Sequence, residues 1–167
     1  PELINRRVRN MSLAPTIAMS VRAAQMRAEG IDVIGLAVGE PDFDTPEHII
    51  EAADKAARAG FTRYTAADGG AAIKAAVARK FARENGIAVQ PSEVHVASGA
   101  KQVIHNAFAA TLEPGDEVVI FTPAWVSYID IVEFCGGRAV TVPTSPERGF
   151  LPEPEALAAA ITPRTRW

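Results

Sequence analysis

A short turn of small residues, Ser98-Gly99-Ala100-Lys101, is the part of the sequence that points most directly to chemistry. It lies between a run typical of a strand, residues 94–97, and a run typical of a helix, residues 102–112. Where such a turn opens a helix, it presents backbone N–H groups at the positive end of the helix dipole. The pattern therefore predicts an anion site, for which phosphate is the usual ligand. The alternative is a turn that merely connects a strand to a helix.

Three other residues could contact a ligand. Trp125 follows an expected strand, and its large flat side chain suits stacking on a planar cofactor, although a packed core tryptophan is the alternative. Gly39 lies in a loop with Pro41, where a glycine lets a ligand approach the main chain closely; a simple turn glycine is the other interpretation. Tyr64 lies in an expected turn, where it could also be an ordinary exposed tyrosine.

The elements that must position these residues alternate between helices and short apolar strands. Expected helices cover residues 17–28, 46–59, 71–84, 102–112, 126–134 and 154–161, and expected strands cover residues 33–37, 94–97, 117–122 and 138–142. Thr45 is expected as the N-cap of the second helix, with Pro46 at its first position. The alternation predicts an α/β fold with a largely parallel sheet.

Composition narrows the classes of partner. The chain has 167 residues, 48% hydrophobic content and a formal net charge of −3, so nothing favours nucleic acid or an anionic membrane as a partner. Its one cysteine, Cys135, excludes an intrachain disulfide and favours a cytoplasmic location. The three histidines lack ligand-like spacing, so no metal site is expected. The chain begins at Pro1 and stops at Trp167, where a new strand is expected to start, so we expect it to be cut at both ends.

Several motifs in chain order resemble one enzyme family. They are residues 32–36, Gly39-Glu40-Pro41-Asp42-Phe43-Asp44-Thr45-Pro46, residues 61–65, residues 80–86, residues 114–118 and Pro123-Ala124-Trp125-Val126-Ser127-Tyr128. Together they resemble the N-terminal part of a class I, fold type I aminotransferase that depends on pyridoxal 5'-phosphate (PLP), of the bacterial aspartate aminotransferase-like group. The resemblance implies an incomplete sheet with flanking helices. It also implies an N-terminal arm and small-domain segment over residues 1–45 and the first part of the large PLP-binding domain over residues 46–167.

The resemblance also implies roles for the candidate residues. Gly99, Ala100 and Lys101 resemble the turn whose backbone amides hold the cofactor phosphate. Trp125 resembles the aromatic residue that stacks on the cofactor ring beside the substrate. The remaining two are Tyr64, which resembles the tyrosine that reaches the partner subunit's cofactor in a homodimer, and Gly39, which resembles the glycine that contacts the substrate carboxylate.

The family's catalytic groups have no counterpart in this chain. The lysine that forms the Schiff base, the aspartate at the pyridine nitrogen and the arginine that binds the α-carboxylate all follow the position of Trp167 in the family. We therefore expect an amino acid and a 2-oxo acid as substrates of the parent protein, and an inactive, poorly soluble isolated chain. Ser12-Leu13-Ala14 stands where relatives that use dicarboxylates or prephenate often carry Lys-Pro-Ser. The positive side chain that would attract a second carboxylate is absent, which argues against an acidic amino-acid substrate and leaves neutral or aromatic substrates open.

Three alternatives stay open at this point. One is a PLP-dependent lyase of the same fold, whose N-terminal half looks alike. Another is a non-catalytic aminotransferase-like ligand-binding domain, although no basic helix-turn-helix segment precedes Ser12. The simplest is a phosphate-binding α/β domain unrelated to PLP.

Overall fold

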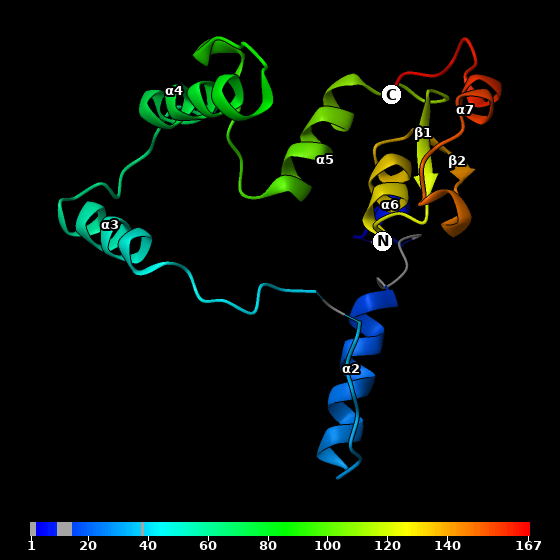
Figure 1. Ribbon diagram of the computed structural model, residues 1–167, viewed down its shortest axis with the longest axis horizontal. Helices are drawn as coiled ribbons and strands as arrows, with labels where there is room; N and C mark the ends of the chain where they lie inside the picture. Colours follow the sequence, from blue (N-terminus) through cyan, green and yellow to red (C-terminus); the bar gives the residue numbers. More distant parts are fainter. Residues whose placement is uncertain (1–2, 10–14, 38) are drawn as a thin grey trace. The chain divides into compact units, whose positions relative to one another are not determined.

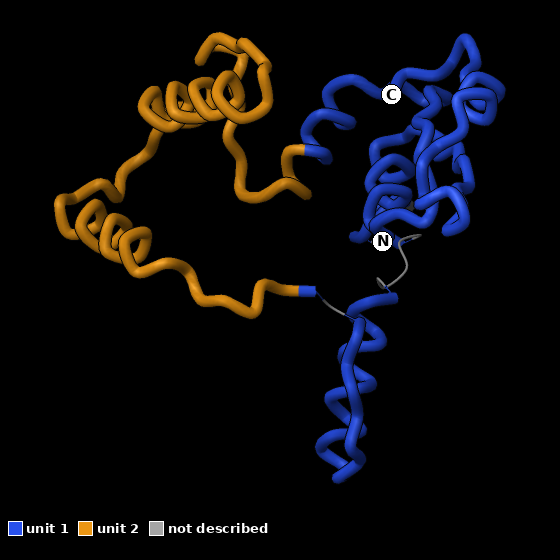
Figure 2. Tube along the Cα trace, in the orientation of Figure 1, with its two compact units in different colours: residues 1–39, 104–167 blue, residues 40–103 orange. Residues whose placement is uncertain are grey.

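The computed structural model describes residues 3–9, 15–37 and 39–167. The chain forms two compact units, residues 1–39 with 104–167 and residues 40–103 (Figures 1 and 2). The helices are α1 (Arg6–Arg9), α2 (Pro15–Ala28), α3 (Glu47–Arg58), α4 (Ala71–Lys80), α5 (Ala100–Thr111), α6 (Ser127–Phe134) and α7 (Pro154–Ala160). The strands are β1 (Glu117–Thr122) and β2 (Arg138–Pro143). None of the described helices is long and apolar enough to cross a membrane.

The first unit contains a parallel strand pair joined by a helix. β1 and β2 run parallel in a register that pairs Glu117 with Arg138 and Thr122 with Pro143, and α6 connects them. This β1–α6–β2 unit confirms the parallel α/β arrangement predicted from the alternation of elements. The observed bounds of β1 are the expected ones. The bounds of α6, β2 and α7 each differ by one residue from those expected for that element.

The core of this unit lies where β1, α6 and the C-terminal part of α5 meet. Six buried apolar side chains form it: Phe108, Leu112, Val118, Ile120, Ile131 and Val132. Val118 and Ile120 alternate along β1 on one face, as a strand period of two requires. Val132 is fully buried. The packing therefore fixes β1 against α6, and with it the position at which the chain leaves the carboxyl end of β1.

β1 is flanked on both sides. Opposite β2, the last residues of the chain lie parallel to β1, with an isolated bridge between Glu117 and Thr165. The N–H of Glu117 donates to the carbonyl of Arg164 at 2.8 Å, and the N–H of Val119 donates to the carbonyl of Trp167 at 2.9 Å. These contacts pair the first half of β1 on both sides, but the segment at Thr165 forms an isolated bridge and not a strand, so the strand expected near Trp167 stays a prediction.

A buried carboxylate joins these three segments. Glu117 is fully buried, and its Oε1 accepts hydrogen bonds from Arg138 on β2 (2.6 Å) and from Arg164 (2.9 Å). Its Oε2 accepts one from the hydroxyl of Thr162 at 2.8 Å. A buried charge is tolerated only when it is paired and hydrogen-bonded, and here four contacts come from two guanidinium groups and one hydroxyl. Hydrogen bonds from Arg138, Thr162 and Arg164 lower the pKa of Glu117 to about 2.

The second unit contains α3, α4 and the start of α5. α4 is the predicted helix in shortened form, because a single π-helical stretch, Phe81–Asn85, continues it to Gly86. Gly86 has φ +66°, a left-handed conformation that ends the helix as glycine often does. A short 3₁₀ turn, Pro91–Glu93, then leads to residues 94–97.

Three local expectations are wrong. Residues 33–37 and 94–97 are extended but form no strand, because no described segment pairs with them in a ladder. Residues 33–37 follow α2, where the guanidinium of Arg27 donates to the carbonyl of Val33 at 3.1 Å. Thr45 does not cap α3, since the N-cap is Pro46, whose ψ of 136° places it outside the helix, and no side-chain cap bond forms.

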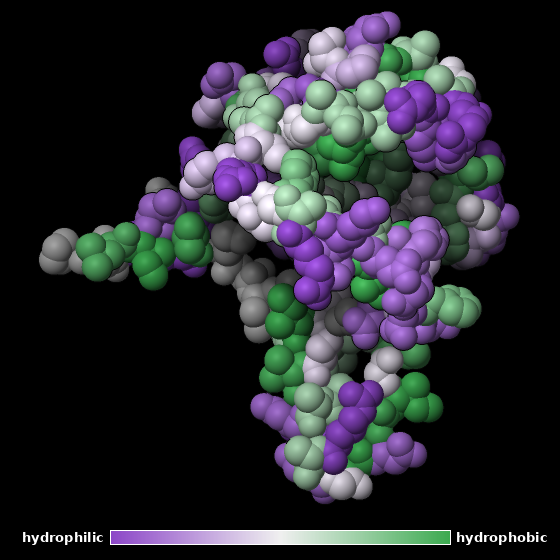
Figure 3. Space-filling view, turned by 90° about the vertical axis from the view of Figure 1, so that its left-hand side faces the viewer, coloured by the Kyte–Doolittle hydropathy of each residue, from purple (hydrophilic) through white to green (hydrophobic). Residues whose placement is uncertain are grey.

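Large apolar side chains are exposed along the described chain, as the hydrophobic residues at the surface in Figure 3 illustrate. The most exposed include Leu3, Ile34, Leu36, Phe43 and Phe61. Exposed apolar surface on this scale is a feature of interfaces or of aggregation-prone proteins. The expected poor solubility of the isolated chain is a prediction that this surface favours.

We expect Glu117→Gln to remove an acid-sensitive part of the stability. The folded pKa of about 2 lies below the ordinary value of 4.5. The stabilisation is therefore complete above pH 4.5 and is lost as the pH falls towards 2. Glu117→Gln should melt at a lower temperature at pH 7, and the difference from wild type should shrink below pH 4. Glu113→Gln, at an exposed position, is the control, and equal pH profiles for the two variants would contradict the prediction.

Candidate functional site

The turn predicted to bind an anion begins α5, as the sequence indicates. Gly99 has φ +92°, a conformation that L side chains rarely adopt, and the helix begins at Ala100. The N–H of Gly99 donates to the carbonyl of Ala97 at 2.9 Å. The amides of Ala100 and Lys101 lie in the first turn of α5, at the positive end of the helix dipole. The backbone therefore fits the binding of an anion at residues 100–101.

Gln102 is a functional neighbour that sequence reasoning missed. Its side-chain oxygen accepts a hydrogen bond of 2.7 Å from the N–H of Ser98. The signal was present in the sequence, because a glutamine three residues after the residue that precedes a helix commonly reaches back to the chain before the helix. This bond closes the turn around Gly99 and orients the start of α5.

Trp125 lies just beyond the carboxyl end of β1 and before α6. Its side chain is 42% exposed and meets the ring of Tyr128 edge to face, with centroids 5.3 Å apart. The N–H of Tyr128 donates to the carbonyl of Trp125 at 3.1 Å, so the two residues form one turn. Ligands of parallel α/β sheets bind at the carboxyl ends of the strands. The indole is therefore placed and exposed for stacking and does not belong to the buried core.

Tyr64 and Gly39 are both open. Tyr64 is fully exposed, in the same unit as the turn at Gly99. Gly39 has no atom within 4 Å of the position that a Cβ would occupy, so its main chain can be approached. Gly39 belongs to the other unit, with Trp125. Of the predicted site residues, Gly99, Ala100 and Lys101 are consecutive and lie together at the start of α5. Tyr64 and Gly39 are each accessible within their own unit.

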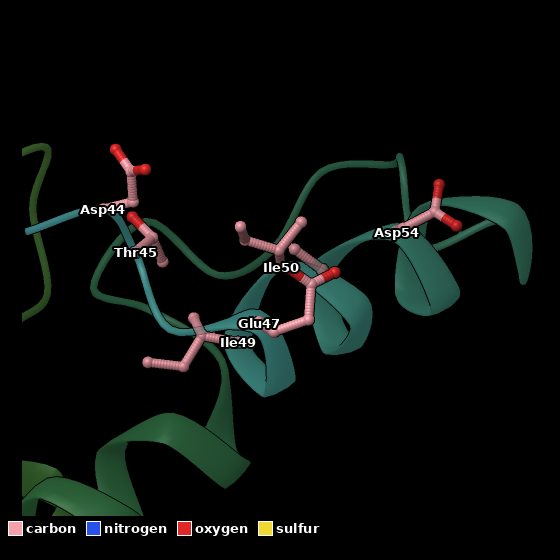
Figure 4. A pocket seen from close by; sticks show the side chains of 7 residues that line it. Asp44, Thr45, Glu47, Ile49, Ile50 and Asp54 are labelled. Atoms are coloured by element: carbon pink, nitrogen blue, oxygen red, sulfur yellow. The ribbon is translucent and has the colours of Figure 1, made fainter.

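Other features carry no site. The pocket beside α3 in Figure 4, about 710 Å³ in volume, is lined by Asp44 and Thr45 before the helix and by Glu47, Ile49, Ile50, Ala53 and Asp54 of the helix. None of the predicted site residues lines it. The Sγ of Cys135 lies 3.6 Å from Nδ1 of His105, and burial raises the pKa of the thiol, which agrees with an inert cysteine. Among the described residues, no group of three or more His, Cys, Asp or Glu could hold a metal ion.

Comparison with known proteins decides the family. The sequence model of the family "Aminotransferase class I and II" matches residues 31–167. The chain belongs to this aminotransferase family. The fold agrees, since the crystal structure of an aspartate aminotransferase from Thermus thermophilus with maleate superimposes with a TM-score of 0.94 at 47% identity, over 99% of this chain and 44% of that one.

Two similar curated relatives are named for aspartate and prephenate. The aspartate/prephenate aminotransferase of Cereibacter sphaeroides is 53% identical over 152 residues, 91% of this chain and 38% of that protein. The probable aspartate/prephenate aminotransferase of Thermus aquaticus is 48% identical over 163 residues, 98% of this chain and 43% of that protein. The chain thus spans about two fifths of the length of these aminotransferases.

We expect Gly99→Ala to destabilise the turn by about 1 kcal/mol, because φ +92° is unfavourable for alanine although its methyl group would meet no atom. Gly39→Ala is the matched control, since its methyl group would also meet no atom within 4 Å. Urea unfolding of the two variants checks this. A loss of stability that is as large for Gly39→Ala as for Gly99→Ala would contradict a conformational requirement at the turn.

Proposed function

We propose that this chain supplies the phosphate and ring contacts for pyridoxal 5'-phosphate in an enzyme that transfers an amino group from an amino acid to a 2-oxo acid. The observation that carries the proposal is an anion-binding turn at the start of α5 in a chain that matches solved aspartate aminotransferases over nearly its whole length. The enzyme would include counterparts of the part of its relatives that this chain does not span.

The residues present fit this cofactor. The amides of Ala100 and Lys101 would donate to the phosphate at the positive end of α5, which costs no reorganisation because Gly99 and Gln102 already orient the turn. The exposed indole of Trp125 would pack against the ring. When bound, the cofactor supplies an electron-accepting ring that makes the α-proton of an amino acid acidic.

The substrate and the partner subunit would meet the open positions. The main chain at Gly39 would contact the carboxylate of the amino acid, and Trp125 would cover one side of the substrate as well as the cofactor. Tyr64, which is fully exposed, would reach the cofactor phosphate of a second subunit. We therefore propose a cytoplasmic homodimer, in which each subunit completes the phosphate site of the other.

The proton-transfer groups would come from outside this chain. None of its lysines matches the family lysine that bonds to the cofactor, so the roles that we assign are binding and orientation. We therefore propose that the 167-residue chain by itself does not catalyse transamination. A longer protein that also contains the region which this chain does not span in its relatives should be active and should produce a 2-oxo acid. Release of ammonia or a thiol by that protein would instead identify a lyase.

The class of amino-acid substrate, acidic or else neutral or aromatic, can be decided by experiment. The relatives' names favour aspartate, whereas Ser12-Leu13-Ala14 lacks the positive side chain that would attract a second carboxylate and leaves neutral or aromatic amino acids open. These three residues lie outside the described part of the chain. Comparing kcat/KM for aspartate with that for a neutral and an aromatic amino acid decides between them.

We expect Trp125→Ala to weaken PLP binding by roughly threefold to tenfold, because an aromatic contact contributes about 0.5–1.5 kcal/mol beyond its buried area. Trp125→Phe should keep most of the affinity, since it retains a flat ring. Titration of the complete protein with PLP, followed by cofactor absorbance, measures both. An unchanged affinity and spectrum in Trp125→Ala would favour a phosphate-binding domain without PLP.

A further inference from the structure

The loop between Tyr64 and α4, residues 66–70, is fastened to the segment that leads into the phosphate turn. The N–H of Val96 donates to the carbonyl of Asp68 at 3.0 Å. Val96 lies two residues before Ser98, whose own N–H is held by Gln102. All these residues belong to the second unit. This backbone hydrogen bond thus joins the segment that follows Tyr64 to the segment that leads into α5.

Gly69 makes this contact close. Its φ is +105°, and a Cβ at this position would lie 2.9 Å from the Cβ of Val96 and 3.0 Å from its Cγ2. Real Cβ atoms do not approach other carbons that closely, so a side chain here would push the loop away from Val96. Both the backbone conformation and the available space therefore require glycine.

Lys74 pairs with the carboxylate of the same loop. It lies near the N-terminus of α4, where a positive charge is disfavoured by the helix dipole, and its side chain is only 12% exposed. A lysine is rarely buried without a partner, and here Nζ donates to Oδ2 of Asp68. This hydrogen bond is the main cause of a lowered pKa of Asp68, which favours the ionised carboxylate.

We propose that Lys74 is a positioning residue that, through Asp68, holds loop 66–70 against Val96 and so fixes the backbone leading into the turn Ser98-Gly99-Ala100-Lys101. The inference rests on the proposed function in that the turn binds the cofactor phosphate. Its consequence is that a side chain on α4, remote in sequence from the turn, sets the affinity for that phosphate.

A merely structural ion pair would behave differently. It would stabilise α4 and change every ligand affinity equally or not at all. A positioning pair changes the phosphate contact alone, so the ratio of the affinities for PLP and for pyridoxal, which lacks the phosphate, separates the two roles. Lys80, which pairs with Glu84 at 3.4 Å on the exposed side of α4, provides a matched control within the same helix.

The test compares Lys74→Met with Lys80→Met in the complete protein. We expect Lys74→Met to lower the affinity for PLP about tenfold with pyridoxal unaffected, and Lys80→Met to change neither; Lys74→Arg, which keeps the charge, should restore most of the affinity. Equal losses for both ligands in Lys74→Met, or no loss, would overturn the positioning role.

Amide hydrogen exchange tests the contact without any ligand. In Lys74→Met and in Asp68→Asn, the amide of Val96 should exchange faster relative to the amides of α5 than it does in wild type. Unchanged protection at Val96 would overturn the inference alone. A wild-type protein that binds pyridoxal as tightly as PLP would instead overturn the phosphate site, and with it the proposed function.

Discussion

The structure of the first unit depends on the buried carboxylate of Glu117. Because this group is fully removed from water, it requires the guanidinium groups of Arg138 and Arg164 and the hydroxyl of Thr162. These partners come from β2 and from the chain after α7, so one charge sets the register of three parallel segments. A register error of one residue would leave a buried carboxylate without partners, which is far more costly than an imperfect apolar contact.

The register of β1, set at its amino end, also determines where the chain leaves its carboxyl end. Six residues after Glu117 the strand has ended, and the chain turns to present Trp125 and then α6. The core around Val132 packs α6 against β1, which fixes the two ends of the short segment that carries Trp125. In the proposed enzyme, the ring contact is therefore held by the sheet, and the phosphate contact by the start of α5.

The sequence predicts well those elements of the first unit whose apolar residues pack into its core. β1 and α6 have alternating or periodic apolar residues that the core buries, and their observed bounds lie within one residue of the expected ones. Residues 33–37 and 94–97 have the same apolar composition but no described partner strand, and composition alone cannot supply one. Lys74 was missed because its partner, Asp68, becomes a neighbour only through the geometry of the loop before α4. Gln102 was missed although its position three residues after Gly99 is a local signal for a bond to the chain before α5. The division at residue 45 and the site roles remain predictions.

The most direct test of the account is a crystal structure of the complete protein with pyridoxal 5'-phosphate. The account predicts that phosphate oxygens accept hydrogen bonds from the amides of Ala100 and Lys101, that the ring stacks on Trp125, and that the covalent bond is made to a lysine outside these 167 residues. A cofactor phosphate bound away from the start of α5, or a covalent bond to a lysine of this chain, would contradict it.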